Sequence, residues 1–367
     1  MKNEERDTMK LLIATGGTGG HIYPAIALAD AAKKRYPDIE ILFVGNDDRM
    51  EAEIVPNHGY RFEGLHACGM TGNVFHKMKA VALMGKAYLH ALKIMDRFQP
   101  DIAIGFGGYV SAPVMLAAHR KGVVTMIHEQ NSVVGMSNKV VAKYMDAIVI
   151  CYEKCYEEFG RDKVRLLGNP RATSAVETKF DKEYFHSLGL REDKPLILVV
   201  MGSLGSSSIN EIMKGVLPSI DPSYQILFVS GKDKYEEVKS AFPQDNIVVV
   251  DYVKQLDIIE KVDLLICRAG ATTAAEILAL GSVSILIPSP YVAHNHQYYN
   301  ASVMVEDGAA EMIEEKDLNQ ETLKTKIEAI MNHPARREQI HQNALRLGKP
   351  NACSDILDWC EELLRQK

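Results

Sequence analysis

Short runs of apolar residues alternate along the chain with longer segments whose apolar positions recur at a helical period. In the first half these runs occupy residues 11–14, 39–44, 102–104, 123–127, 147–150 and 164–167. In the second half they occupy residues 196–200, 225–229, 247–250, 264–267 and 283–287. Continuous runs of Ile, Val and Leu, each followed by a helix, are typical of parallel strands that are covered on both faces. The pattern therefore predicts an α/β protein with one doubly wound parallel sheet in each half.

A change of pattern near Gly168-Asn169-Pro170-Arg171 predicts the boundary between the two halves. The 367 residues exceed what a single hydrophobic core usually holds. Pro170 disfavours a helical conformation at Asn169 and has its own φ fixed, so we expect a linker to begin here. We predict one domain over residues 1–170 and a second over residues 171–347.

Charge and composition exclude several classes of protein. The net charge of −6 gives no overall attraction to nucleic acid. No apolar stretch approaches the roughly 20 residues that span a bilayer. The six cysteines lack the spacing of a metal site, and reduced thiols in the cytoplasm are the simpler interpretation. Because no Asp-x-Asp motif stands beside a predicted strand end, we predict no metal and no cofactor.

The most informative motif, Gly16-Gly17-Thr18-Gly19-Gly20-His21, lies between the first predicted strand and a helix. Its four glycines remove the Cβ atoms from the turn, so backbone N–H groups and the positive helix end can surround an anion. A tight turn alone would need fewer glycines. The dinucleotide fingerprint G-x-G-x-x-G fails because Ile22 takes the place of its third glycine, which disfavours an NAD-dependent oxidoreductase. The motif predicts a phosphate-binding loop that ends in a titratable histidine.

Polar or glycine-rich segments also follow other predicted strands, where doubly wound sheets bind their ligands. They are Gly107-Gly108-Tyr109, His128-Glu129-Gln130-Asn131, the serine-rich segment 202–208, the segment 268–276 that ends in Glu276, and the segment 295–300. Close packing of strand and helix, capping by serines, and compensation of a helix dipole by Glu276 near a first turn remain alternative roles. As a ligand contact, Glu276 would accept two hydrogen bonds from a ribose diol.

In this order the motifs resemble those of glycosyltransferase family 28, whose bacterial members act in peptidoglycan synthesis. The resemblance covers nearly the whole chain and rests on Gly-Gly-Thr-Gly-Gly-His at 16–21, Gly-Gly-Tyr-Val-Ser at 107–111, His-Glu-Gln-Asn at 128–131, Gly-Asn-Pro at 168–170, Cys-Arg-Ala-Gly at 267–270, Glu276 and Gln297-Tyr298. It implies a GT-B fold, in which two Rossmann-like domains face a cleft, with a helix over about residues 348–367 packed back on the first domain. It also implies transfer of N-acetylglucosamine from UDP-GlcNAc to the muramoyl 4-hydroxyl of the undecaprenyl-linked acceptor lipid I, which gives lipid II.

The resemblance also implies the roles of individual residues. The donor UDP-GlcNAc would contact Thr18, Gly19, Gly20, Asn131, Ser203, Val253, Glu276 and Gln297, with Glu276 at the ribose. The acceptor diphosphate would meet Gly17, Gly107, Gly108 and Tyr109. Leu204 and His296 stand where relatives often carry glutamine, and both departures lie beside a donor contact.

Transfer with inversion requires a base for the attacking hydroxyl. We predict His21 for this role because imidazole titrates near neutral pH, with Glu129 or His128 as the reserve base or as an orienting group. Helix N-termini and loop amides would carry the charge of the departing diphosphate without a metal.

A lipid-linked acceptor implies contact with a membrane. In the predicted helical segment 71–98, Met78, Val81, Tyr88, Leu92 and Met95 form an apolar stripe that we expect to face the core. Off that stripe lie Val74, Phe75, Leu83 and Met84, interspersed with His76, Lys77, Lys79 and Lys86. This mixture suits an anionic inner membrane surface, although an ordinary outer helix would look similar. We expect a peripheral protein on the cytoplasmic face of the cell membrane, and the resemblance implies contacts with other cell-wall synthesis proteins.

Two other functions fit parts of the pattern. A UDP-GlcNAc 2-epimerase shares the two-domain architecture and the UDP-sugar, but the glycine motifs fit it poorly. A non-enzymatic subunit that recruits partners to the membrane would need only one half of such a fold, whereas both halves here have a predicted phosphate loop.

Overall fold

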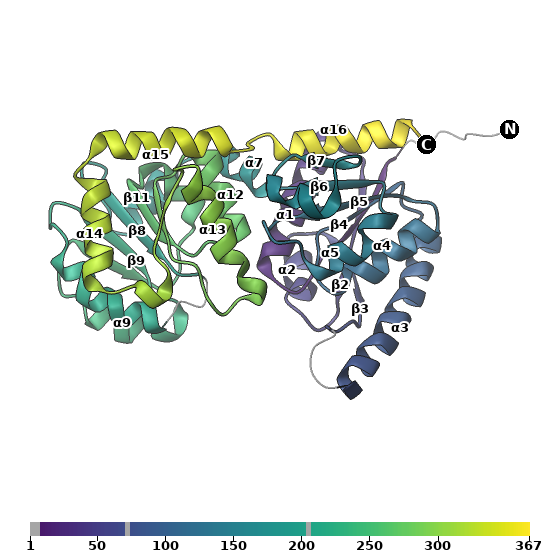
Figure 1. Ribbon diagram of the computed structural model, residues 1–367, viewed down its shortest axis with the longest axis horizontal. Helices are drawn as coiled ribbons and strands as arrows, with labels where there is room; N and C mark the ends of the chain where they lie inside the picture. Colours follow the sequence, from purple (N-terminus) through teal and green to yellow (C-terminus); the bar gives the residue numbers. More distant parts are fainter. Residues whose placement is uncertain (1–7, 70–73, 203–206) are drawn as a thin grey trace. The chain divides into compact units, whose positions relative to one another are not determined.

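The computed structural model describes residues 8–69, 74–202 and 207–367 of the chain. The chain divides into two compact units: unit 1 comprises Met1–Thr173 and Asn351–Lys367, and unit 2 comprises Ser174–Pro350. In each unit, helices cover both faces of a central sheet (Figure 1). The predicted α/β architecture with two Rossmann-like parallel sheets is confirmed.

The sheet of unit 1 has seven strands in the order β3-β2-β1-β4-β5-β6-β7. Every neighbouring pair is parallel. The strands are β1 (Lys10–Ala14), β2 (Glu40–Asn46), β3 (Arg61–Leu65), β4 (Ile102–Gly105), β5 (Val124–Glu129), β6 (Ala147–Ile150) and β7 (Val164–Leu166). The helices that belong to this unit are α1 (Gly19–Arg35), α2 (Glu51–Asn57), α3 (Val74–Phe98), α4 (Ser111–Arg120), α5 (Met136–Val141), α6 (Tyr156–Phe159) and α16 (Ala352–Arg365). The strand order reverses its direction between β1 and β4, which makes this pair the switch point of the sheet.

The sheet of unit 2 has six strands in the order β10-β9-β8-β11-β12-β13, with its switch point between β8 and β11. The strands are β8 (Leu196–Val200), β9 (Gln225–Val229), β10 (Ile247–Val250), β11 (Leu264–Cys267), β12 (Ser284–Leu286) and β13 (Glu311–Met312). The helices are α8 (Lys182–Ser187), α9 (Ser207–Val216), α10 (Tyr235–Ser240), α11 (Gln255–Ile258), α12 (Ala271–Leu280), α13 (His296–Glu306), α14 (Gln320–Met331) and α15 (Pro334–Leu347).

The chain passes from unit 1 to unit 2 within a helix rather than in an extended linker. Pro170 is the first residue of α7 (Pro170–Glu177), a position where proline loses no helical hydrogen bond. The side chain of Asn169 accepts a hydrogen bond from the N–H of Arg171 at 3.0 Å, as in an Asx turn at a helix start. The sequence predicts that a linker begins at Pro170, whereas the structure has a helix there, so this prediction is wrong.

The terminal helix α16 belongs to unit 1 although 177 residues of unit 2 precede it in the sequence. Its residues Ile356, Leu357 and Trp359 are buried in the same hydrophobic cluster as the inner face of α1. Arg35 of α1 forms ion pairs with Asp358 at 2.6 Å and with Glu361 at 2.6 Å. Packing of an apolar helix face, with ion pairs at its margin, fixes the end of the chain on unit 1.

Helix α3 buries the C-terminal part of the predicted apolar stripe, where Met95 is buried and Tyr88 and Leu92 are half-buried, but not its N-terminal part. Its core contacts are mostly small residues, namely Ala80, Ala87 and Ala91, followed by larger side chains near its C-terminal end, Ile94, Met95 and Phe98. The predicted stripe is wrong at Met78 and Val81, whose side chains are 66% and 59% exposed. Alanines allow α3 to lie close to α4, so the larger apolar residues stay outside. Within the described part of the chain, no helix is both long and apolar enough to cross a bilayer.

Candidate functional site

The glycine-rich loops after β1 and β4 meet at the switch point of unit 1. The last residues of these strands, Ala14 and Gly105, are paired in register, so both loops leave the same edge of the sheet. A Cβ atom on Gly108 would lie 2.3 Å from the carbonyl oxygen of Gly16, and Gly108 has a φ of +84°. Only glycine satisfies this approach and this conformation together. The structure thus brings two of the predicted phosphate loops into backbone contact.

The first loop holds His21 in a defined orientation. Helix α1 begins at Gly19, within the glycine motif itself, so His21 lies in its first turn. The Nδ1 atom of His21 is 3.0 Å from the carbonyl oxygen of Gly16 and 3.4 Å from the hydroxyl of Thr18. A carbonyl can only accept, so Nδ1 carries the proton and Nε2 is the basic nitrogen of the neutral ring. Nε2 lies 3.1 Å from where a Cβ on Gly107 would stand, against the second glycine loop.

Helix α1 also supplies backbone donors beside His21. The N–H groups of Gly19 and Gly20 lie in its first turn, where donors have no carbonyl partner within the helix. The N-cap residue Thr18 is extended and makes no side-chain capping bond. The positive end of the helix dipole therefore faces the space next to the imidazole.

A buried carboxyl group that the sequence did not reveal supports the first loop. Glu51, the first residue of α2, is fully buried, and its Oε2 accepts a hydrogen bond from the N–H of Gly17 at 3.1 Å. Its Oε1 accepts from the N–H of Asn46 at 2.9 Å. The N–H of Gly17 therefore already has a partner within the protein, and the contact of Gly17 with an acceptor diphosphate stays a prediction. An acidic residue at a helix start is usually explained by the helix dipole, so sequence alone does not reveal this role.

The structure does not support His128 as a reserve base. Its side chain is 1% exposed and stacks on Phe106 with ring centroids 5.0 Å apart. Its Nε2 donates to the carbonyl oxygen of Gly168 at 3.0 Å, which ties the end of β5 to the segment before α7. Desolvation lowers the pKa of His128 to about 4, so the buried ring is neutral. It is a structural histidine.

Protonation of His128 should couple to the stability of unit 1. An unfolded histidine has a pKa of about 6.5, so the unfolded chain takes up this proton first as the pH falls. The contribution of His128 to the free energy of unfolding is therefore complete above the unfolded pKa of about 6.5. It is lost as the pH falls towards the folded pKa of about 4. We expect this residue alone to lower the free energy of unfolding by about 2 kcal/mol between about pH 7 and about pH 5. Urea titrations at both pH values measure it, and an equal pH dependence in folded His128→Gln would contradict the assignment.

Glu129 is likewise occupied within the protein rather than exposed to a substrate. One carboxylate oxygen accepts from the N–H of Asn131 at 3.1 Å, and the other from the N–H of Gly135 and the side chain of Asn138, both at 2.9 Å. Burial raises the pKa of Glu129, and these hydrogen bonds oppose the shift. The expected reserve role for Glu129 in proton transfer is therefore corrected to one of shaping the loop between β5 and α5.

This shaped loop and its neighbours present two predicted ligand contacts to solvent. Asn131 is half-buried, and its carbonyl oxygen accepts from the thiol of Cys155 at 3.3 Å. Tyr109 is 54% exposed, and a Cβ on Gly69 would lie 2.5 Å from its ring. Gln130 links the loop to the second glycine segment by donating to the carbonyl oxygen of Phe106 at 2.8 Å. The loops after β1, β4 and β5 therefore form one connected surface.

In unit 2 the predicted donor contacts lie at the carboxyl ends of the strands. Glu276 is 7% exposed and is the sixth residue of α12, in its second turn, a position that favours the alternative of dipole compensation less than a first-turn position would. Val253 is buried among apolar residues, which leaves its backbone for ligand contact. Gln297 is half-buried, and its Oε1 accepts from the N–H of Ser289 at 2.9 Å. Ser203, and Leu204 beside it, lie outside the described residues.

The segment before Gln297 has an unusual backbone. His294 and Asn295 have φ values of 55° and 52°, in the left-handed region that non-glycine residues rarely adopt. Such conformations cost about 1–3 kcal/mol each and concentrate at binding sites. Nearby, Arg268 bridges strands and loops by donating to the carbonyl oxygen of Ile287 at 3.0 Å and by pairing with Glu315 at 2.7 Å. Arg268 therefore links the loop after β11 both to the end of β12 and to the segment that contains Glu315.

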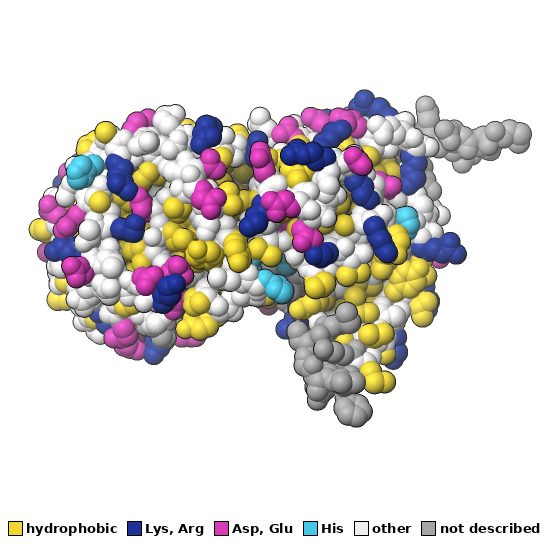
Figure 2. Space-filling view, viewed as in Figure 1, with side chains coloured by type: hydrophobic (Ala, Val, Ile, Leu, Met, Phe, Trp, Pro, Cys, Tyr) yellow, Lys and Arg dark blue, Asp and Glu magenta, His cyan; other side chains and the backbone are white. Residues whose placement is uncertain are grey.

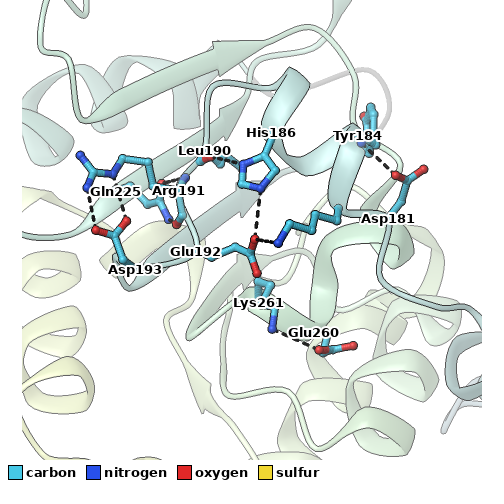
Figure 3. Close-up of polar contacts among 11 residues, drawn as sticks. Asp181, Tyr184, His186, Leu190, Arg191, Glu192, Asp193, Gln225, Glu260 and Lys261 are labelled. Carbon is cyan, nitrogen blue, oxygen red and sulfur yellow. Dashed lines mark hydrogen bonds and ion pairs between the residues drawn. The ribbon is translucent and has the colours of Figure 1, made fainter.

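Polar clusters elsewhere do not share these features. Figure 3 shows a set of surface contacts near the starts of β8 and β9, where Glu192 lies between Lys182 and His186 at 2.8 and 3.1 Å. Two surface hollows of about 410 and 370 Å³ also lie near strand starts, at the edge opposite to the glycine loops. Within the described ranges, one group could offer three metal ligands, Asp47, Asp48 and His66, and all three are exposed.

The fold and these loops define a class of two-unit α/β proteins with Rossmann-like parallel sheets, in which glycine-rich loops follow the carboxyl ends of the strands. The N-terminal domain of glycosyltransferase family 28 matches residues 11–150, and the C-terminal domain of that family matches residues 196–356. The chain belongs to glycosyltransferase family 28.

Curated relatives and solved structures agree with this membership. A UDP-N-acetylglucosamine–N-acetylmuramyl-(pentapeptide) pyrophosphoryl-undecaprenol N-acetylglucosamine transferase of Limosilactobacillus fermentum is 40% identical over 95% of this chain and 97% of its own length. The Bacillus cytotoxicus protein of that name is 37% identical over 98% of this chain and 100% of its own. The crystal structure of Acinetobacter baumannii MurG shares the fold, with a TM-score of 0.78 at 24% identity over 97% of this chain and 99% of that one. The crystal structure of a putative UDP-N-acetylglucosamine 2-epimerase of Listeria monocytogenes has a TM-score of 0.72 at 14% identity over 98% of each chain. The fold alone therefore does not separate the two activities.

Proposed function

We propose that this enzyme transfers N-acetylglucosamine from UDP-GlcNAc to the 4-hydroxyl of the muramoyl sugar in undecaprenyl-diphospho-MurNAc-pentapeptide, forming lipid II. The names of relatives that match nearly the whole chain support this substrate pair. The observation that carries the proposal is the placement of His21, whose Nδ1 is held by Gly16 at the switch point. An oriented imidazole next to a helix N-terminus is what deprotonation of an alcohol beside an anionic group requires.

In this mechanism unit 1 supplies the proton acceptor. Nε2 of His21 takes the proton of the muramoyl 4-hydroxyl while its oxygen attacks the anomeric carbon of the sugar. The bond from that carbon to the diphosphate oxygen breaks, UDP leaves, and the single displacement inverts the α-linked donor to a β-linked product. Backbone donors at the start of α1, including Gly19 and Gly20, favour a negatively charged group at this edge.

Unit 2 holds the nucleotide in this proposal. The carboxylate of Glu276 accepts hydrogen bonds from the ribose hydroxyls, and the backbone of Val253 reads the uracil edge. Gln297 contacts the sugar or diphosphate from the start of α13. Their placement at the carboxyl ends of the strands supports this assignment, because doubly wound sheets bind nucleotides there.

An acceptor-dependence assay tests the proposal against the alternatives. The purified chain is incubated with UDP-GlcNAc, with and without lipid I, and both UDP and free sugars are quantified. The transferase releases UDP only when lipid I is present, and lipid II appears in equal amount. Formation of free N-acetylmannosamine without acceptor would instead identify an epimerase, and silence in both arms would favour a non-enzymatic subunit.

We further propose that α3 places unit 1 on an anionic membrane surface. Met78, Val81 and Leu89 are exposed apolar residues on this helix, with the exposed Lys79 and Lys86 between them. Figure 2 shows hydrophobic and basic side chains side by side over this part of unit 1. Of the sequence-predicted membrane residues, Leu83 and Met84 are half-buried, while the side chains of Val74, Phe75, His76 and Lys77 lie outside the described part. Apolar side chains among lysines gain from both lipid insertion and attraction to anionic headgroups.

The double substitution Met78→Ser and Val81→Ser should weaken binding to vesicles that contain anionic lipid. Each serine removes apolar area that would otherwise leave water, at about 25 cal/mol per Å². Co-sedimentation with such vesicles measures the effect, and turnover with a short-chain soluble acceptor should stay unchanged. The control replaces two exposed apolar residues on other helices, Val176 and Leu345, with serine. Equal vesicle binding by both variants would exclude α3 as the contact.

A further inference from the structure

The peptide group that joins Gly16 to Gly17 is hydrogen-bonded on both of its sides. Its N–H donates to Oε2 of Glu51 at 3.1 Å, and its C=O accepts from Nδ1 of His21 at 3.0 Å. The N–H and C=O of a trans peptide lie in one plane and point in opposite directions, so Glu51 and His21 bind opposite edges of one rigid group. The three groups form a continuous chain from a buried carboxyl group to an imidazole.

We propose that Glu51 is a positioning residue for His21, acting through the Gly16–Gly17 peptide. The inference rests on the proposed function, in which His21 is the base. An acceptor on the N–H side polarises the peptide, so its carbonyl oxygen becomes a stronger acceptor for the Nδ1–H of His21. This fixes the tautomer that keeps the lone pair on Nε2, as the carboxylate does directly in a Ser-His-Asp triad.

The same contact selects one orientation of a peptide that could otherwise flip. A peptide between two glycines has no Cβ atom to resist rotation, and Gly17 already has a φ of +90°. After a flip, the carbonyl oxygen would face the carboxyl oxygens of Glu51, and Nδ1 of His21 would face an N–H group. The first contact would be repulsive, and the second would require His21 to change to the Nε2–H tautomer, so Glu51 holds the orientation that keeps Nε2 basic.

Three glycines make room for this arrangement. A Cβ on Gly16 would lie 2.2 Å from Oε1 of Glu51, and a Cβ on Gly45 would lie 2.6 Å from its Cγ. On the other side, Gly108 covers the carbonyl oxygen of Gly16. The second hydrogen bond of Glu51, from the N–H of Asn46, anchors the carboxyl group to the end of β2. His128 is a further titratable neighbour of His21, and its burial keeps it neutral.

The tautomer of His21 tests the proposal without any substrate. In the wild type, histidine-selective ¹⁵N spectra should show His21 as the Nδ1–H form, with its signals identified by their loss in His21→Ala. In Glu51→Gln the amide cannot accept at both positions, so a population of the Nε2–H form should appear. An unchanged tautomer in folded Glu51→Gln would overturn the proposal. If that variant does not fold, the same spectra are recorded for Glu51→Asp, whose side chain is one methylene shorter. The Nε2–H form should appear there too, and an unchanged tautomer would again overturn the proposal.

A kinetic cycle separates positioning from a general structural role. Glu51→Gln should lower kcat by about 10–100-fold, the usual cost of removing a group that orients a functional histidine, with the KM for UDP-GlcNAc unchanged. In the His21→Ala background the same substitution should have no further effect, because it acts through His21. Equal losses in both backgrounds would overturn the inference and leave the proposed function intact. The control Glu53→Gln, at an exposed position on α2, should keep wild-type activity.

If the wild type itself shows no acceptor-dependent turnover, the proposed function fails. The tautomer measurement still decides whether Glu51 orients His21. The two failures are therefore distinguishable.

Discussion

His21→Ala is expected to lower kcat for acceptor-dependent transfer by about 10²–10⁴-fold, the usual contribution of a positioned base. The imidazole is held by the carbonyl oxygen of Gly16, and its Nε2 is the basic nitrogen. The alanine variant keeps the backbone donors of α1, so its affinity for UDP should equal that of the wild type. Single-turnover kinetics and calorimetric titration with UDP measure the two quantities separately.

The control for this prediction is another histidine of unit 1. His119 is exposed at the C-terminal end of α4. Its ring packs against that of Tyr144, with the ring centroids 5.5 Å apart. His119→Ala should retain full turnover. Near-full turnover by His21→Ala with unchanged UDP affinity would remove His21 as the base. A loss of UDP affinity equal to the loss of kcat would instead assign it to donor binding.

Most of the sheet could be predicted because its strands are continuous apolar runs. Strands β6, β8, β9, β10 and β11 have the predicted bounds. Two strands escaped prediction. β3 is Arg61-Phe62-Glu63-Gly64-Leu65, an edge strand with polar positions, and β13 has only two residues. Neither segment has the continuous apolar run by which other strands, including the edge strand β10, are recognised.

The α3 prediction holds at Met95 and is wrong at Met78 and Val81. Periodicity identifies an apolar face, but it does not say whether that face meets the core or a different environment. On α3 the residues that contact the core are mainly Ala80, Ala87 and Ala91, which contribute little to an apolar pattern. The larger residues Met78 and Val81 were therefore assigned to the wrong side.

The site could be predicted only as far as loops and residue types allow. The glycine loops and His21 are visible in the sequence because their composition is unusual. The internal roles of His128 and Glu129 depend on burial beneath Phe106 and on the amides of a loop. Glu51 reaches Gly17 across 34 positions of sequence, so only the fold reveals the contact. Sequence indicates which groups can react, whereas packing decides which of them meets solvent.

Gly108→Ala should damage both stability and turnover. Its Cβ would lie 2.3 Å from the carbonyl oxygen of Gly16, which is the acceptor for His21. A positive φ costs about 1–2 kcal/mol for a residue with a Cβ, and a forced backbone shift adds about 1–3 kcal/mol. Because that shift moves the group that orients the base, we also expect kcat to fall by about 10²-fold.

Gly122→Ala is the matched control, since it isolates the backbone conformation from the clash. Gly122 has a φ of +72°, and a Cβ there would meet nothing within 4 Å. Its substitution should cost only the conformational term of about 1–2 kcal/mol and leave kcat unchanged. Calorimetric unfolding and turnover of both variants give the comparison. If the two lose equal stability and Gly108→Ala keeps its turnover, the loops after β1 and β4 can separate freely, and the contact between them does not hold the base in place.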